Sequence, residues 1–160
     1  MTDRIAWYQV ASHSKEVLPE GGRLHLRVQS RYITLFRRNN VCSAIDSICH
    51  HAGGPLTLGE VEDMEDLGLA VVLCPWHKYR VDIVTGSKVY QSVEVIDGKP
   101  HVMGWRIGRM VQRVHLVRED DDDTLYVGVE LGEPVESCPS DADACNFNCA
   151  RGYILHKDFF

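Results

Sequence analysis

Two short segments constrain this chain more than any others: Cys49-His50-His51 and Cys74-Pro75-Trp76-His77. Each segment carries one Cys and one His separated by one or two residues, so a single tight loop can direct both side chains into the same small volume. Thiolates and imidazoles are typical ligands of transition metals. The two matched segments therefore predict one metal site assembled from two loops.

The residues that follow each segment suit such loops. Ala52-Gly53-Gly54-Pro55-Leu56 places two glycines where backbone N–H groups can approach the sulfurs, and a proline that stiffens the exit. Residues 78–83, which follow the second segment, alternate in polarity as a strand does. We therefore expect the second Cys–His pair to lie at the tip of a hairpin.

The ligand set allows two metal sites. Two Cys and two His can divide between two irons of a [2Fe–2S] cluster, with both thiolates on one iron and both imidazoles on the other. Two Cys and two His can also bind structural zinc. Zinc motifs usually place two Cys together and then two His, whereas each half here mixes the two residue types. The spacing favours the cluster, and zinc remains the alternative.

The segments CHHAGGPL and CPWHKY resemble the two cluster-binding loops of Rieske ferredoxins and Rieske-domain proteins. The resemblance extends from about Trp7 to Leu131 and includes the weaker matches Tyr90-Gln91-Ser92 and Val111 to His115. It implies a Rieske fold of small antiparallel sheets, in which two loops form a cluster-binding subdomain, and a [2Fe–2S] cofactor. The implied ligands are Cys49 and Cys74 on the inner iron, and His51 and His77 on the outer, solvent-facing iron.

The chain departs from the Rieske proteins of respiratory complexes at two places. Those proteins carry an additional Cys in each loop, and the two form a disulfide, whereas this chain has Gly54 and Trp76. Those proteins also follow the second His with Gly-Ser, where this chain has Lys78 and Tyr79. Fewer donors to sulfur imply a low reduction potential.

The remaining pattern predicts an all-β chain. Short runs of alternating or apolar residues are bounded by turn residues, and no long helical period occurs. The expected strands are Trp7–Val10, Leu24–Val28, Tyr32–Phe36, Val41–Ile45, Leu69–Leu73, Arg80–Val84, Val89–Ile96, Gln112–Val117 and Leu125–Leu131. Glu60 to Asp66 is expected to form an exposed turn or a single helical turn, and Glu119 to Asp123 a solvated turn.

The remaining histidines and cysteines are not assigned to the metal site. We expect His50 to be a solvated or capping side chain, and the other histidines to carry no functional signal. Cys42, Cys138, Cys145 and Cys149 are best explained as free thiols, then as a disulfide, and then as zinc ligands. Tyr153–Leu155 could add an edge strand. The predicted division is a Rieske domain over residues 1–137, with a cluster-binding region at about 46–85, and a Cys-containing extension over 138–160.

Length and charge exclude several classes of function. A chain of 160 residues suits one domain and is too short for a cluster domain joined to a catalytic iron domain. A net charge of −6 and a pI near 5.7 argue against nucleic-acid binding. The sequence contains no apolar run of membrane-spanning length and begins without a signal peptide, so we expect a soluble, cytoplasmic protein with no membrane partner.

These observations predict an electron carrier that is not an enzyme by itself. It would pass single electrons from a reductase, such as a flavoprotein, to an oxygenase or another acceptor. A redox-responsive regulatory module and a small subunit of a larger oxidoreductase, such as a nitrite reductase, are the alternatives, because both need the same ligands.

Overall fold

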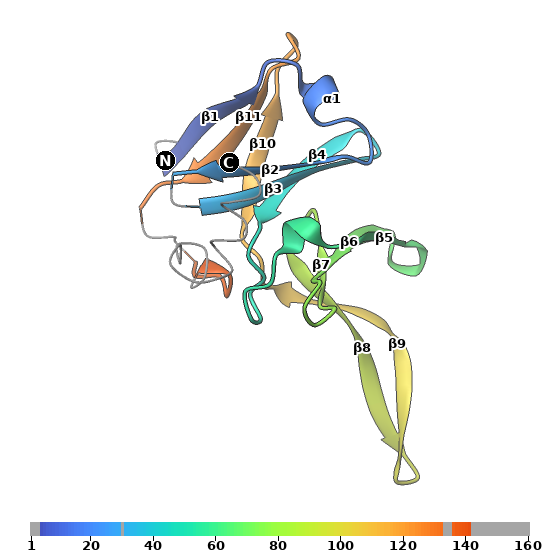
Figure 1. Cartoon of the computed structure of the whole chain (residues 1–160). Coiled ribbons are helices and arrows are strands. Elements are labelled where there is room, and N and C mark those ends of the chain that lie inside the picture. Colours follow the sequence, from blue (N-terminus) through green and yellow to red (C-terminus); the bar gives the residue numbers. More distant parts are fainter. Residues whose placement is uncertain (1–3, 30, 133–135, 142–160) are drawn as a thin grey trace.

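The computed structural model describes residues 4–29, 31–132 and 136–141, which fold into two antiparallel sheets, one of which extends into a projecting hairpin (Figure 1). The six-stranded sheet has the order β1-β11-β10-β4-β3-β2. Its strands are β1 (Ile5–Ala11), β2 (Arg23–Val28), β3 (Arg31–Arg38), β4 (Val41–Asp46), β10 (Val114–Glu119) and β11 (Leu125–Glu130). A short helix, α1 (Ser14–Val17), connects β1 to β2.

The second sheet has five strands in the order β5-β6-β7-β8-β9. These strands are β5 (Val61–Met64), β6 (Leu69–Leu73), β7 (Arg80–Asp82), β8 (Ser87–Ile96) and β9 (Lys99–Met110). Two 3-10 turns, η2 (Leu56–Leu58) and η3 (Glu65–Leu67), precede β5 and β6. None of the helices in the described ranges is long and apolar enough to cross a membrane.

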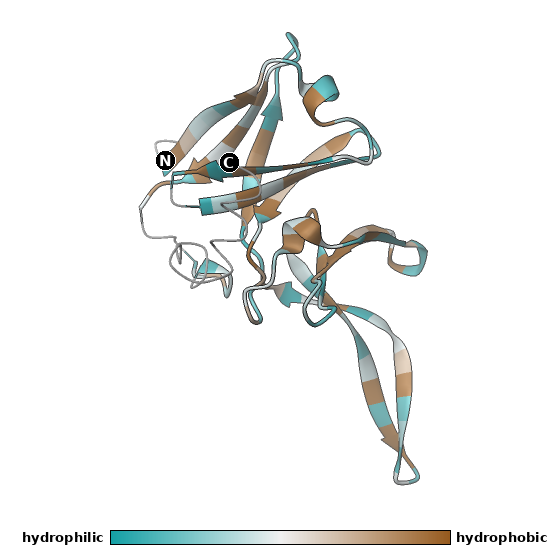
Figure 2. Cartoon of the chain, viewed as in Figure 1, coloured by the Kyte–Doolittle hydropathy of each residue, from teal (hydrophilic) through white to brown (hydrophobic). Residues whose placement is uncertain are grey.

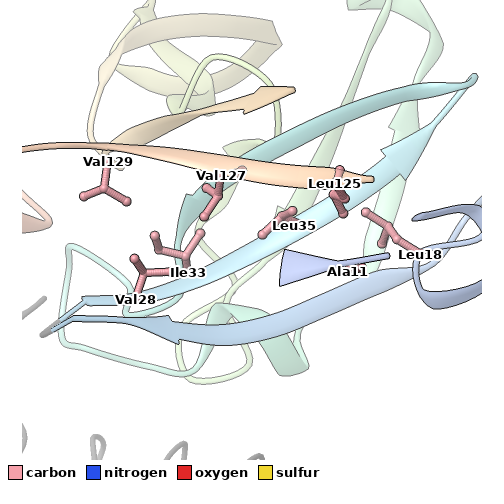
Figure 3. Packing of buried hydrophobic residues seen from close by; sticks show 9 residues of the cluster. Ala11, Leu18, Val28, Ile33, Leu35, Leu125, Val127 and Val129 are labelled. Atoms are coloured by element: carbon pink, nitrogen blue, oxygen red, sulfur yellow. The ribbon is translucent and has the colours of Figure 1, made fainter. Parts of the chain in front are cut away.

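Apolar side chains from the six-stranded sheet pack together with Leu18, which follows α1, and form a hydrophobic core (Figure 3). Alternation places these side chains on one face of each strand, because successive residues of a strand point to opposite faces. The buried members are Ala11, Leu18, Val28, Ile33, Leu35, Ala44, Leu125, Val127 and Val129. Leu24 and Leu26 pack against this core, as the alternation in β2 predicts.

A second core joins the two sheets and contains two of the predicted ligands. Phe36 of β3 and Ile45 of β4 contribute from the first sheet, and Val72 and Val81 from the second. Cys49 and Cys74 belong to the same cluster, together with Leu56, Ile83 and Val111. The thiols are thus held by the packing that fixes the smaller sheet to the larger one.

The far part of the β8–β9 hairpin projects beyond the other strands of the second sheet (Figure 1). Apolar and hydrophilic residues alternate along it, as Figure 2 shows. Its exposed apolar side chains include Val93, Val95, Val102 and Ile107. Only the first part of β8 pairs with β7, at Lys88 and Val89. The distal hairpin is therefore held by its own two strands.

The all-β prediction is confirmed, with differences in four strands. We did not anticipate β9. β5 occupies part of the segment expected to form an exposed turn or a single helical turn, and the 3-10 turn η3 follows β5. β5 is an edge strand whose exposed Glu62 and Asp63 hide the strand pattern. Two other expected strands are displaced or shortened, because β7 ends at Asp82 and β10 begins at Val114.

Candidate metal centre

The first Cys–His segment forms a tight loop closed by two backbone hydrogen bonds. The N–H of Cys49 donates to the carbonyl of Gly54, and the N–H of Gly53 donates to the carbonyl of Cys49, both at 2.8 Å. Gly53 has φ of 76°, in the left-handed region that glycine adopts without strain. An isolated bridge between Ile48 and Pro55 closes the base of the loop.

The second segment repeats this pattern at the tip of the β6–β7 hairpin, as predicted. The N–H of Cys74 donates to the carbonyl of Tyr79, and the N–H of Lys78 donates to the carbonyl of Cys74, both at 2.8 Å. Lys78 occupies the position equivalent to Gly53 and has φ of 59°. The two loops therefore have the same backbone frame despite their different sequences.

The two thiols lie side by side beneath the loops. Cys49 is fully buried and Cys74 nearly so. A hydrogen bond between them, together with burial, raises the pKa of Cys49 well above its usual value. The same hydrogen bond lowers the pKa of Cys74 to about 6.

Backbone N–H groups also point at both sulfurs, as expected. The donors come from the residues just after each Cys: His51 and Ala52 for the first sulfur, and Trp76 and His77 for the second. Such donors stabilise negative charge on sulfur ligands.

The two predicted imidazole ligands lie together on the outside of the loops. His51 and His77 are both exposed, and their ring centroids are 4.9 Å apart with the planes nearly perpendicular. Tyr79 stacks on His51 with a centroid distance of 4.3 Å. The tyrosine ring thus packs against a candidate ligand and limits its rotation.

Gly54 and Trp76 face each other across the two loops. A Cβ atom built on Gly54 would lie 3.1 Å from Cγ of Trp76 and even closer to the sulfur of Cys74. These are the two positions where respiratory Rieske proteins carry the additional cysteines. The indole of Trp76, which is 44% exposed, fills that space in this chain.

His50, expected to be a solvated or capping side chain, is half-buried. Its backbone N–H donates to Oε1 of Gln112 at 2.6 Å, and its Nδ1 lies 3.1 Å from the same oxygen. Gln112 is fully buried, and its Nε2 donates to the carbonyls of Asp46 and Ile48. Sequence analysis missed Gln112, although it lies in the weakly matching segment Val111 to His115.

His115 and Glu119 also have side-chain partners that the sequence did not indicate. His115 is buried, and its Nε2 lies 2.8 Å from Oδ1 of Asp46. Glu119 belongs to β10 rather than to a solvated turn, and its carboxylate bonds the buried guanidinium of Arg37 at 3.2 Å. Sequence analysis could not identify these pairs, because the two residues of each pair lie far apart in the sequence and no local spacing connects them.

The tail cysteines are only partly covered by the structure. Cys42 and Cys138 are free thiols, which agrees with the first expectation for them. Cys145, Cys149 and the expected strand Tyr153–Leu155 lie outside the described residues.

The donor set fits a [2Fe–2S] group. Two sulfur donors lie buried and adjacent, two imidazoles lie together at the surface, and backbone N–H groups face the sulfurs. A binuclear cluster takes two protein ligands on each iron.

A β fold with two Cys–His loops at one end of a small sheet defines the Rieske class. A family model described as soluble Rieske-type ferredoxin matches residues 11–131. A human Rieske domain-containing protein is 36% identical over 121 residues, which cover 74% of this chain and 72% of the human protein. The chain belongs to the soluble Rieske-type ferredoxin family. It is therefore an electron-transfer protein of the iron–sulfur class.

Solved structures show the same fold at low sequence identity. A chain in the complex of reduced oxygenase and oxidised ferredoxin of carbazole 1,9a-dioxygenase has a TM-score of 0.55 and 19% identity, covering 80% of this chain and 97% of that one. A Mycobacterium tuberculosis protein assigned as the small subunit of an NADH-dependent nitrite reductase has a TM-score of 0.57 and 18% identity, covering 80% and 98%.

Proposed function

We propose that the two loops hold a [2Fe–2S] cluster, with Cys49 and Cys74 on the inner iron and His51 and His77 on the outer iron. The observation that carries this assignment is the difference in depth between the ligand types. The two sulfurs are buried and adjacent, whereas the two imidazoles are exposed and adjacent. When bound, such a cluster supplies a centre that takes up and releases one electron at a time.

The side chains around the site suit electron transfer at a docked surface. His51 and His77 are exposed, so a partner can approach either ring directly. The buried thiols and the inter-sheet core keep water from the inner side. Backbone donors to the sulfurs offset the negative charge that an added electron brings.

The proposed partners are a flavoprotein reductase as donor and an oxygenase or similar protein as acceptor. The ferredoxin of carbazole 1,9a-dioxygenase, which forms a complex with an oxygenase, supports this by its similar fold. Electron-transfer contacts of this kind are small and salt-sensitive. We further propose a cytoplasmic location, a low potential, and a division into a cluster domain over 1–137 and an extension over 138–160.

Metal and sulfide analysis of four single variants tests the assignment. Freshly purified protein is expected to be red-brown, with about two irons and two labile sulfides per chain. Replacing Cys49, His51, Cys74 or His77 by Ala should abolish the colour, while Cys42→Ser and Cys138→Ser should keep it. One equivalent of zinc without labile sulfide in anaerobically prepared protein would contradict the proposal.

A further inference from the structure

Residues 136–141 lie beyond the part of the chain that the family model matches, yet they pack tightly against it. Ser140 is fully buried and Cys138 nearly so. The N–H of Ser140 donates to the carbonyl of Val111 at 3.2 Å, and the N–H of Arg113 donates to Oγ of Ser140 at 2.8 Å. This segment is thus bonded to the backbone on both sides of Gln112.

The carboxylate of Asp141 fixes the end of this segment. It accepts hydrogen bonds from Nε and Nη2 of Arg113 at 3.1 and 2.7 Å, and from the backbone N–H of Cys138 at 2.7 Å. Nη2 of Arg31 is a further donor. Charge-assisted bonds of this kind are stronger than neutral ones.

Ser140 connects the segment to a buried carboxylate near the first loop. Its hydroxyl donates to Oδ2 of Asp46 at 2.6 Å. Nε and Nη2 of Arg31 donate to the same carboxylate, each at 2.7 Å, and Nε2 of His115 lies 2.8 Å from Oδ1. Asp46 ends β4 and precedes Cys49 by only two intervening residues.

A continuous series of hydrogen bonds then reaches the ligand loop. The carbonyl of Asp46 accepts from Nε2 of Gln112 at 3.1 Å, and that of Ile48 accepts from the same nitrogen at 2.9 Å. Oε1 of Gln112 accepts from the N–H of His50 at 2.6 Å. His50 lies directly between the proposed ligands Cys49 and His51.

We infer that residues 136–141 form a latch that positions the first ligand loop, with Ser140 and Asp141 as positioning residues. The series of bonds from Ser140 through Asp46 and Gln112 to His50 is the physical link. Asp141 holds Ser140 in place through Arg31 and Arg113. This inference rests on the proposed cluster site, because the latch acts on the loop that carries two of its ligands.

Two truncations that differ by only six residues test the latch. One chain ends after Asp141 and keeps every bond described above, and the other ends after Val135 and lacks the latch. The first should match the full chain in its electron paramagnetic resonance spectrum and in its rate of iron loss to a chelator. The second should show shifted resonance lines and lose iron roughly tenfold faster, as expected when charge-assisted bonds are lost.

If the chain that ends after Val135 does not fold, point variants of the full chain test the same inference. Ser140→Ala and Asp141→Asn should each shift the resonance lines in folded protein, and Asp141→Glu should restore them in part. The exposed Asp121→Asn is the matched control and should shift nothing. Unchanged spectra in all latch variants would overturn the inference. A full chain that binds no cluster would instead overturn the proposed function.

Discussion

At the scale of single residues, the first ligand loop depends on one buried amide. Gln112 satisfies two carbonyls, of Asp46 and Ile48, and the N–H of His50. Without this side chain, these backbone groups would be buried without partners. Leaving buried polar groups unsatisfied costs more than a single hydrogen bond contributes, because each group has already lost its water.

Replacing Gln112 by Leu should therefore destabilise the protein by about 3 kcal/mol. Leu has a similar size, so the loss would come from hydrogen bonding rather than from a cavity. Chemical denaturation followed by circular dichroism measures the change. Gln91→Leu, at an exposed position of β8, should stay within about 0.5 kcal/mol of the wild type. Equal effects at both positions would refute the role given to Gln112.

Asp141 should make stability depend on pH. Burial alone would raise its pKa, but hydrogen bonds from Arg113, the backbone N–H of Cys138 and Arg31 lower the pKa to about 2. In the unfolded chain the usual value is 3.8. A lowered pKa stabilises the folded state above the unfolded pKa, and this contribution is lost as the pH falls toward the folded pKa.

The melting temperature of Asp141→Asn should accordingly lie below that of the wild type from pH 7 down to about 4. The difference should shrink as the pH falls from about 4 toward 2 and vanish only below pH 2, where the carboxyl is protonated in the folded chain as well. Thermal unfolding of both proteins at each pH measures this difference, and effects of acid common to both cancel. A difference that grows toward low pH would contradict the assigned partners.

At the scale of elements, the turn between β7 and β8 shows why a particular glycine is required. Gly86 has φ of 69°, and its carbonyl accepts from the N–H groups of Val111 and Gln112 at 2.8 and 3.1 Å. A Cβ atom at this position would overlap the carbonyl oxygen of Gln112. Gly68 has φ of 66°, but a Cβ atom there would meet nothing within 4 Å.

Substitutions at the two glycines therefore allow the cost of backbone strain to be measured separately from the cost of steric overlap. Gly68→Ala should cost about 1 kcal/mol, because a left-handed conformation is unfavourable for a residue with a side chain. Gly86→Ala should cost about 3 kcal/mol, because overlap with Gln112 is added to the same strain. Chemical denaturation of the two variants and the wild type measures both losses of stability. Equal costs would show that the turn does not pack closely on Gln112.

The sequence predicted some elements well and hid others for physical reasons. β6 stood out because Leu69–Leu73 is a continuous apolar run that becomes fully buried toward its end. β9 was not predicted, because Gly104, Gly108 and several basic residues interrupt its alternation of apolar and polar residues. Its extended conformation depends on pairing with β8, which the sequence pattern of β9 alone does not indicate. The four candidate ligands were visible because their spacing is local. Gln112 was not, because its three backbone partners lie more than sixty residues away.

The distal β8–β9 hairpin should be the least stable regular element. A two-stranded hairpin with no third layer is marginally stable in water, and Val95 and Val102 are 73% and 66% exposed. Its amides between Val93 and Val102 should exchange with solvent through local opening, much faster than those of the buried strand β3. Hydrogen exchange measured by mass spectrometry tests this. Protection equal to that of β3 would mean that another surface covers the hairpin.

At the scale of the whole molecule, two sheets share one core, and that core ends in the ligand loops. Phe36 and Ile45 from the larger sheet pack with Val72 and Val81 from the smaller one, and the two thiols lie in the same cluster. The fold therefore fixes the sulfurs through its inter-sheet packing and leaves the imidazoles at the surface. This arrangement suits a carrier that must keep its centre rigid and still contact successive partners.

The most direct test of this account is pulsed electron paramagnetic resonance of the reduced protein labelled with ¹⁵N-histidine. Nitrogen bound to a paramagnetic iron couples to the unpaired electron, so the account predicts coupling from two histidine nitrogens. The same couplings should persist in His50→Ala and disappear together with the cluster in His51→Ala or His77→Ala. A reduced cluster without histidine coupling, or a diamagnetic zinc protein without sulfide, would contradict the assignment of His51 and His77 as iron ligands.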